Sequence, residues 1–243
     1  GGFNNYKEMC ASVLMPGVKH MRHTFLPEHK FVRGQPDTGA ELADDLETIA
    51  NKFDGEVAAC IVEPIAGSTG TLIPPKGYLN KLRKICDKHD ILLIFDEVIT
   101  GWGRTGSVFA AQEFDVTPDL MTMAKATTNG VVPMGVVAVR DNIYDSIVNS
   151  ATEGSIELFH GYTYSGIPVA VAAALAVQDI FEKEDIFQRV KNMSPYFQNA
   201  LHSLRDLDCV KSIRGYGMMG GIDIQMKDKP GKAGFQIYKA CYA

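Results

Sequence analysis

The sequence lacks an apolar run long enough to cross a lipid bilayer. Its longest apolar stretch, residues 167–180, falls short of the roughly 18 residues that a membrane helix needs, and it continues into a charged segment. The sequence also lacks a basic cluster, because its net charge is −5 and acidic and basic residues are interleaved. These absences argue against a membrane span, a membrane-surface site and a nucleic-acid partner.

Cysteine is scarce, and its pattern offers no framework of disulfides. The five cysteines are scattered, odd in number and never spaced as C-x-x-C. Cys60 lies in an apolar run, which predicts a buried thiol. The pattern favours a reducing compartment and therefore a cytoplasmic protein. His20 and His23 are close enough in sequence to suggest a metal, but they have no third ligand, so solvated or hydrogen-bonded histidines are favoured.

What the sequence does contain is an alternation of apolar strands and amphipathic helices. Dense apolar runs at 57–62 and 91–95 predict strands buried on both faces, as in parallel sheets, and shorter strands are predicted at 119–123 and 134–139. Helical segments are predicted at 40–53, 78–89, 108–114, 142–149, 167–181 and 185–207. The alternation predicts an α/β fold with a mostly parallel sheet sandwiched by helices.

Three features of the second half refine this prediction. The alanine-rich helix at 167–181 is expected to be buried, and Pro195 could interrupt the helix that follows. The pattern changes after residue 184, and residues 210–224 combine strand character with many glycines. We therefore expect a large domain over residues 1–183 and the start of a small α+β domain over 184–243. Both chain ends look cut, since the first lacks Met and the second lies within an amphipathic segment.

Two adjacent acids, Asp96 and Glu97, follow the apolar run at 91–95. Ligands of open α/β sheets bind beyond the carboxyl ends of the strands, so this pair is a candidate site. A magnesium–nucleotide site would also need a G-x-x-x-x-G-K-[ST] loop, which the sequence does not have. Residues 101–106 match G-x-G-x-x-G, but Asp96 to Thr100 separate this loop from the strand. A glycine-rich turn is therefore favoured over a dinucleotide site.

Lys125 is the second candidate, because it follows a short apolar strand and precedes small residues and a glycine. A lysine in this place would lie at the same sheet edge as Asp96. The alternative is an ordinary surface lysine. The pairing of an amine with an acid favours the functional interpretation, since pyridoxal-phosphate chemistry needs a lysine for the Schiff base and an acid beside the pyridine nitrogen.

Five short motifs occur together and in order along the chain. They are EPIAGS at 63–68, PPKGYL at 74–79, FDEVITG at 95–101, KATTNG at 125–130 and HGYTYS at 160–165. In this combination the chain resembles the class III aminotransferases, and among them those that act on omega-amino acids such as β-alanine with pyruvate. The resemblance covers essentially the whole chain and implies the large domain of a fold type I pyridoxal-phosphate enzyme, in part.

The resemblance also implies a role for individual residues. Lys125 matches the Schiff-base lysine and Asp96 the acid that pairs with the pyridine nitrogen. Val98 matches the apolar residue on one face of the ring, and Glu63 a glutamate at the floor of the site. Thr163 matches a residue that reaches the cofactor phosphate of a partner subunit. Packing remains the alternative for Val98 and Thr163, and helix capping the alternative for Glu63.

The implied activity moves an amino group from an omega-amino acid or amine to pyruvate or another keto acid, with pyridoxal 5'-phosphate as cofactor. The implied partners are these small molecules and further copies of the chain, as a homodimer or a dimer of dimers. An aminomutase or decarboxylase on the same scaffold, or an inactive fragment, are the alternatives. The family's Ser/Gly-rich phosphate loop, stacking aromatic residue and carboxylate-binding arginine are not found. Residues 1–243 alone are therefore expected to bind cofactor weakly. Trp102 and Ile167 stand where the family pattern has Phe and His.

Overall fold

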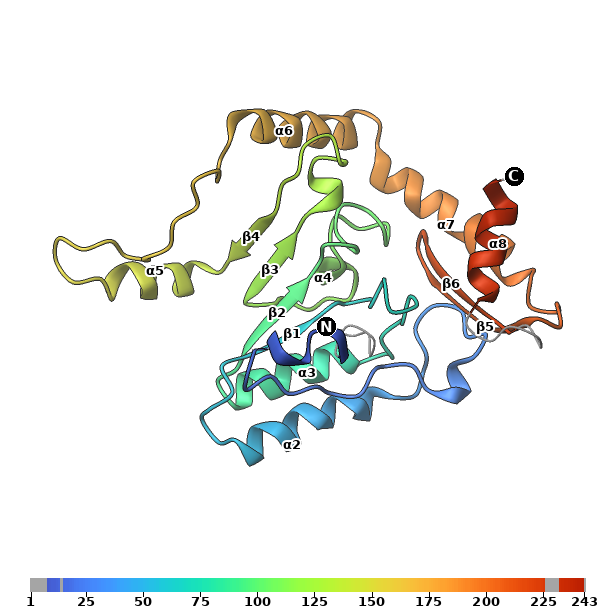
Figure 1. The fold of residues 1–243 in the computed structure, drawn as a ribbon, viewed down its shortest axis with the longest axis horizontal. Helices are drawn as coiled ribbons and strands as arrows, with labels where there is room; N and C mark the ends of the chain where they lie inside the picture. The colour runs from blue at the N-terminus through green and yellow to red at the C-terminus, as the bar shows by residue number, and fades with distance from the viewer. Residues whose placement is uncertain (1–7, 14, 226–231, 243) are drawn as a thin grey trace.

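The computed structural model describes residues 8–13, 15–225 and 232–242. Its main sheet has four strands in the order β1 (Ala59–Val62), β2 (Leu92–Asp96), β3 (Leu120–Met123) and β4 (Val136–Val139). The first three strands pair in parallel, and β4 joins β3 in the antiparallel direction. Figure 1 shows this sheet in the middle of the molecule with helices beside it. The predicted α/β class and mostly parallel sheet are confirmed.

The two faces of the main sheet differ in burial. The turn η3 (Ala40–Ala43) and the helices α2 (Asp44–Lys52) and α3 (Tyr78–Lys88) form a core with one face, where Leu93 and Phe95 are fully buried. On the other face Ile61 is 61% exposed and Val137 58% exposed. The prediction of strands buried on both faces was therefore wrong for this face, because no described segment covers these side chains.

The remaining elements include helices near the predicted positions 108–114, 142–149, 167–181 and 185–207, together with short turns and a helix α8 that were not predicted. They are the short turns η1 (Ala11–Val13), η2 (Pro27–His29) and η4 (Lys125–Thr127), the helices α4 (Ala110–Glu113), α5 (Asp141–Asn149), α6 (Pro168–Lys183), α7 (Ile186–His202) and α8 (Ala233–Tyr242), and the strands β5 (Val210–Tyr216) and β6 (Met219–Ile224). Cys60 is buried, as predicted. Within the described ranges, no helix combines the length and apolarity needed to cross a membrane.

Two expectations about the second half were wrong. Helix α6 is not buried as a whole: Ala170, Ala174 and Val177 face the protein, whereas Leu175 is 59% exposed. An alanine-rich composition permits burial on every side, but the described chain packs against only one stripe of this helix. Helix α7 also continues through Pro195.

The strands β5 and β6 form a separate antiparallel hairpin that packs against loops of the main sheet. The buried guanidinium of Arg214 donates to the carbonyl of Gly70 (2.9 Å) and pairs with Asp223 (2.6 Å). The Met218 amide donates to the carbonyl of Arg104 (2.9 Å). These contacts fix the hairpin near the loops that follow β1 and β2. The boundary at residue 184, just before α7, stays a prediction.

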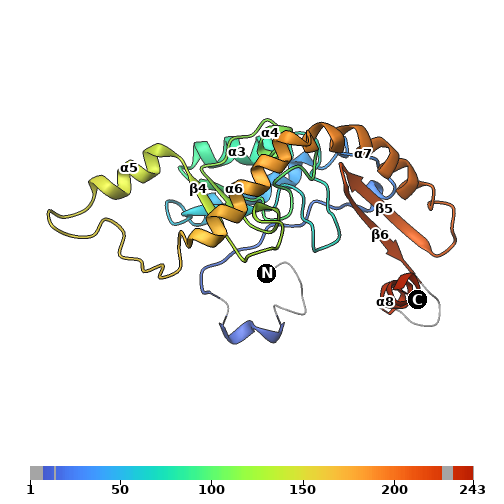
Figure 2. The ribbon, with the colours of Figure 1, turned by 90° about the horizontal axis from the view of Figure 1, so that it is seen from above.

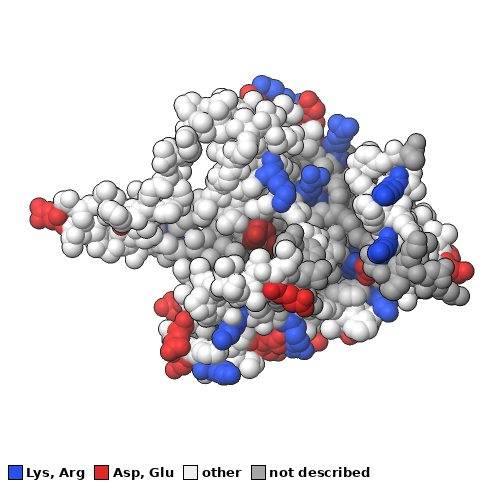
Figure 3. Space-filling view, viewed as in Figure 1, with Lys and Arg blue, Asp and Glu red and all other residues white. Residues whose placement is uncertain are grey.

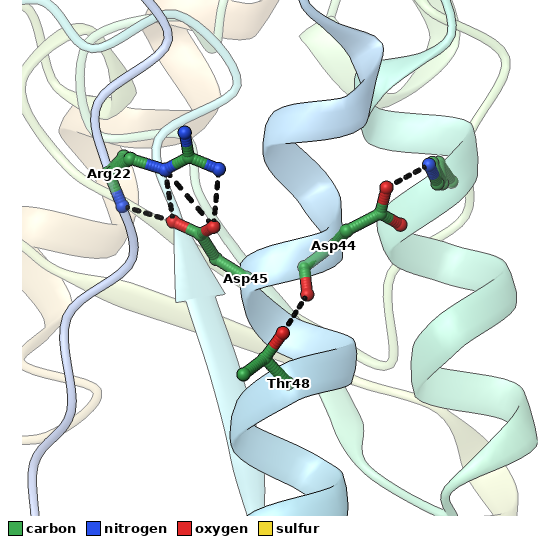
Figure 4. Close-up of polar contacts among 5 residues, drawn as sticks. Arg22, Asp44, Asp45 and Thr48 are labelled. Atoms are coloured by element: carbon green, nitrogen blue, oxygen red, sulfur yellow. Dashed lines mark hydrogen bonds and ion pairs between the residues drawn. The ribbon is translucent and has the colours of Figure 1, made fainter.

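The amino-terminal part of the described chain runs along α2. Arg22 binds the carboxylate of Asp45 through its backbone amide and its guanidinium, with Nη2 to Oδ1 at 2.6 Å. Figure 4 shows this contact beside Asp44 and Thr48 of the same helix, where the Thr48 hydroxyl donates to the Asp44 carbonyl. The Arg22 contact holds an otherwise extended segment against the helical layer.

Residues 150–167 form a long connection between α5 and α6 that projects from the body of the molecule in both ribbon views (Figures 1 and 2). Figure 3 shows this projection as largely uncharged on the visible face, with acidic residues at its outer end. Several large apolar side chains of this segment are exposed, among them Phe159, which is 93% exposed. We call residues 150–167 the projecting segment.

Asp119, which directly precedes β3, forms contacts with residues of β2, of α3 and after β4. Its carboxylate accepts the Leu93 amide of β2 (2.7 Å) and pairs with Arg83 of α3 (2.6 Å) and with Arg140 after β4 (3.3 Å). Burial by itself would raise the pKa of Asp119. The amide hydrogen bond and the two guanidinium groups outweigh it and hold this pKa below its ordinary value of 3.8.

We predict that Asp119→Asn lowers the free energy of unfolding by about 2–3 kcal/mol, because it leaves the half-buried Arg83 short of a partner. Urea unfolding followed by circular dichroism measures this loss. The difference from wild type should shrink as the pH falls below about 4, since a depressed folded-state pKa gives stability that is present above the unfolded value and lost under acid.

Asp87→Asn is the matched control. It removes the charge of Asp87, which also pairs with Arg83 but has a side chain that is 62% exposed. Its cost should stay below about 0.5 kcal/mol. Equal losses for the two variants would contradict a special role for Asp119.

Candidate active site

The carboxyl ends of β1, β2 and β3 meet at one edge of the sheet, and each brings one predicted residue there. Glu63 directly follows β1, Asp96 is the last residue of β2, and Lys125 lies two residues after β3. The register pairs Val62 with Phe95 and Asp96 with Thr122. Since neighbouring strands lie about 4.8 Å apart, this edge gathers two carboxylates and an amine within a few strand spacings.

The adjacent acids Asp96 and Glu97 point to different surroundings. Asp96 is half-buried, and its Oδ1 accepts the Val98 amide (3.1 Å). It lies on the less covered face of β2, because side chains alternate and Phe95 faces the core. Asp96 therefore keeps carboxylate capacity for another partner.

Glu97 is only 1% exposed and is committed to the protein interior. Its carboxylate accepts the amides of Ala110 (2.9 Å) and Ala111 (2.7 Å), at the start of α4, and the hydroxyl of Thr100 (2.6 Å). Burial raises the pKa of Glu97 above its ordinary value, and these hydrogen bonds, which lower the pKa, offset only part of that shift. Of the two acids, only Asp96 is placed to act on a ligand, because Glu97 serves as a buried cap.

Lys125 begins the turn η4 with a backbone φ of 44°, and its side chain is exposed. This left-handed conformation is uncommon for a residue with a side chain. The turn is closed by the Thr127 amide, which donates to the Ala124 carbonyl (3.0 Å), and the Thr127 side chain is buried. A strained backbone persists where surrounding contacts hold it, and it commonly marks a functional position.

The other predicted residues fall into two places. Val98 lies in the turn directly after Asp96, and Glu63 at the end of β1 accepts the Gly67 amide through Oε2 (2.9 Å). Thr163 lies elsewhere, on the projecting segment. It lines an open hollow of about 500 Å³ whose described lining includes Tyr162 and Gly135 but not Glu63, Asp96 or Lys125. The structure thus brings four of the five together.

The glycine-rich loop after β2 is a turn, as predicted. Gly103 and Gly106 have φ values of 97° and 102°. The amides of Trp102 and Gly103 both donate to the Val108 carbonyl, and the Gly106 amide donates to the Gly103 carbonyl. These amides are used within the loop, which leaves them unable to hold a pyrophosphate. In the described residues, no group of three or more His, Cys, Asp or Glu side chains is arranged to hold a metal ion.

One contact of this edge was not anticipated from the sequence. The indole Nε1 of Trp102 donates to the hydroxyl of Thr127 (3.0 Å) and so connects the loop after β2 with the turn that carries Lys125. Trp102 stood out in the sequence only as a departure from a family pattern. Its donor and acceptor are 25 residues apart, which no local pattern reveals.

Comparison with known proteins agrees with the motifs. The family model "Aminotransferase class-III" matches residues 4–240. The chain is 51% identical to an omega-aminotransferase of Caulobacter vibrioides over 94% of this chain and 53% of that protein. It is 45% identical to an omega-amino acid–pyruvate aminotransferase of Pseudomonas putida over 99% of this chain and 55% of that protein. The chain thus spans about half the length of these curated relatives.

A solved structure gives the same result for the fold. The crystal structure of a thermostable (S)-enantioselective omega-transaminase from Thermomicrobium roseum superposes with a TM-score of 0.71 at 39% identity. The superposition covers 76% of this chain and 41% of the other. The sheet and its flanking helices are therefore those of a known transaminase large domain.

We predict that Glu97→Ala lowers the free energy of unfolding by about 2–4 kcal/mol, because two amides and a hydroxyl lose their buried acceptor. Asp96→Ala is the matched control: the same truncation one residue earlier removes one hydrogen bond at a half-buried site and should cost no more than about 1 kcal/mol. Thermal and urea unfolding of both variants measure the costs. If Asp96→Ala proves the more destabilising, the assignment of the two acids is reversed.

Proposed function

The chain belongs to the class-III aminotransferase family, and we propose that the protein moves an amino group from an omega-amino acid or amine to pyruvate or another keto acid. The proposed cofactor is pyridoxal 5'-phosphate. The names of the relatives support the reaction class, since they include an omega-aminotransferase and an omega-amino acid–pyruvate aminotransferase.

The observation that carries this proposal is the placement of Lys125 and Asp96 at the ends of adjacent parallel strands. An amine that can bind the cofactor covalently and a carboxylate beside its ring nitrogen are the two side chains that this cofactor needs. Asp96 retains free carboxylate capacity, and Lys125 is exposed. The chemistry of the residues at this edge therefore fits the cofactor. When bound, the cofactor supplies an electron sink for the substrate carbon that loses a proton.

Each residue has a proposed task at this edge. The Lys125 amine would hold the cofactor covalently and, when free, would act as the general acid and base that moves a proton. The Asp96 carboxylate would keep the ring nitrogen of a bound cofactor protonated, because a nearby negative charge favours the charged form. Val98 presents an apolar surface to one face of the ring. Glu63, fixed by the Gly67 amide, forms part of the floor.

Thr163 is proposed to serve a second copy of the chain. It lies on the exposed projecting segment, where a residue that reaches the cofactor phosphate of a partner subunit would be accessible to that subunit. The exposed apolar side chains of this segment support a homodimer or a dimer of dimers, because a symmetric contact would bury these side chains on both copies of the chain. A cytoplasmic location also stays a prediction, supported by cysteines that are all free thiols.

We predict that Lys125→Ala in the whole protein abolishes the covalent attachment of pyridoxal 5'-phosphate and lowers turnover by at least about 10²–10⁴-fold. Reduction with borohydride followed by peptide mass spectrometry locates the modified lysine. Lys84→Ala, at an exposed position of α3, is the control and should leave attachment and turnover unchanged. Attachment that persists in Lys125→Ala would contradict the assignment.

Product analysis with β-alanine and pyruvate identifies the reaction. Alanine formed in proportion to the β-alanine consumed is the expected result. Carbon dioxide release or an isomerised amino acid without alanine would indicate a decarboxylase or an aminomutase instead.

For the assembly, we predict that sedimentation velocity of the whole protein shows a dimer or a tetramer. Phe159→Ser should weaken self-association by about 10-fold or more, since a large apolar side chain would lose its burial. Tyr196→Ser, at an exposed position of α7, is the control and should have little effect. A wild-type protein that sediments only as a monomer would remove the proposed role of Thr163.

A further inference from the structure

We propose that Trp102 is a positioning residue for Lys125, acting through a hydrogen bond from its indole to Thr127. This inference rests on the proposed function, because it concerns the placement of the proposed cofactor-binding lysine. It assigns a task to a residue that lies in the loop after Asp96 and does not itself carry the chemistry.

The Trp102 ring is held from several directions. Its backbone has a φ of 61°, and its amide donates to the Val108 carbonyl (2.6 Å). The indole stacks on Phe181 of α6, with ring centroids 6.1 Å apart and planes 18° from parallel. Phe109 packs edge-on against the indole, with ring centroids 5.1 Å apart. The backbone hydrogen bond and the two ring contacts together fix the orientation of the indole and therefore the direction of its N–H.

That N–H ends on a buried hydroxyl that is tied to the lysine turn. Thr127 is 3% exposed, and its Oγ1 accepts from the indole (3.0 Å) while donating to the carbonyl of Ala124 (3.0 Å). The Thr127 amide donates to the same carbonyl (3.0 Å). Ala124 directly precedes Lys125. The peptide that sets the left-handed φ of Lys125 is therefore fixed by Thr127, and Thr127 is fixed by Trp102.

The bridge also joins the two loops that carry the proposed chemistry. Trp102 belongs to the loop that follows Asp96, and Thr127 belongs to the turn that begins with Lys125. Each loop leaves the sheet from its own strand, and beyond the last register pair, Asp96 with Thr122, the ladder no longer aligns the two side chains. The indole–hydroxyl bond restores a fixed distance between the loops.

A double-variant cycle in the whole protein tests this role. Trp102→Phe keeps an aromatic ring between Phe109 and Phe181 but removes the N–H, and Thr127→Val removes the hydroxyl with little change of shape. In the cofactor-free protein, each variant should speed hydrogen exchange of the Thr127 and Thr128 amides by about 3–10-fold, as expected for the loss of one hydrogen bond. In the loaded enzyme, kcat should fall by a similar factor while KM for the amine changes less than about 2-fold.

Two comparisons decide the outcome. Thr127→Ser, which keeps the hydroxyl, should behave like wild type, and the double variant should be no worse than either single variant, because both remove the same bond. Additive effects, or normal exchange and kcat in both Trp102→Phe and Thr127→Val, would overturn the inference. If Trp102→Phe disturbs folding, the Thr127 pair decides alone. Failure of the proposed function is recognised separately, since the wild-type protein would then show neither covalent attachment of the cofactor nor formation of alanine from β-alanine and pyruvate.

Discussion

Parallel pairing of β1, β2 and β3 is the constraint on which the candidate site depends. Parallel strands end at the same edge of a sheet. This brings Glu63, Asp96 and Lys125 to one edge, although they are 33 and 29 positions apart in the sequence. The antiparallel strand β4 does not share this property, because its carboxyl end lies at the other edge. The candidate site residues are therefore concentrated at the ends of three strands rather than spread over the sheet.

The alternation of side chains along β2 divides the work of two neighbouring acids. Phe95 faces the helical core, so Asp96 turns to the opposite, less covered face. Glu97 follows as the chain leaves the strand and turns inward to α4, where three donors surround it. The buried Glu97 carboxylate is tolerated because these donors replace the water that it loses. The same hydrogen bonds hold the backbone next to Asp96 in place. One acid holds the local structure while the other remains available.

Much of the fold, and the position of the candidate site residues at one sheet edge, could be predicted because the signals are local. Apolar runs gave the parallel strands, helical periodicity gave α2 and α3, and ordered motifs pointed to Lys125 and Asp96. The errors came from features that local sequence does not contain. The composition of α6 does not say that only the stripe through Ala170 and Ala174 is covered. Proline inside α7 weakens a helix locally, but it removes only one hydrogen bond, and packing against β5 keeps the helix continuous. The Trp102–Thr127 bond depends on tertiary structure alone.

Because of the Trp102–Thr127 bond, the position of Lys125 depends on residues outside its own strand. Phe181, which stacks on Trp102, lies near the end of α6 and contacts Phe187 at the start of α7 (5.4 Å between ring centroids). Phe187 in turn packs over Gly103, where a Cβ would lie 3.0 Å from its ring. The end of α6 and the start of α7 therefore pack against the loop that holds Trp102. Two aromatic contacts and one hydrogen bond therefore connect the start of α7, beside the expected domain boundary, with the turn that carries Lys125.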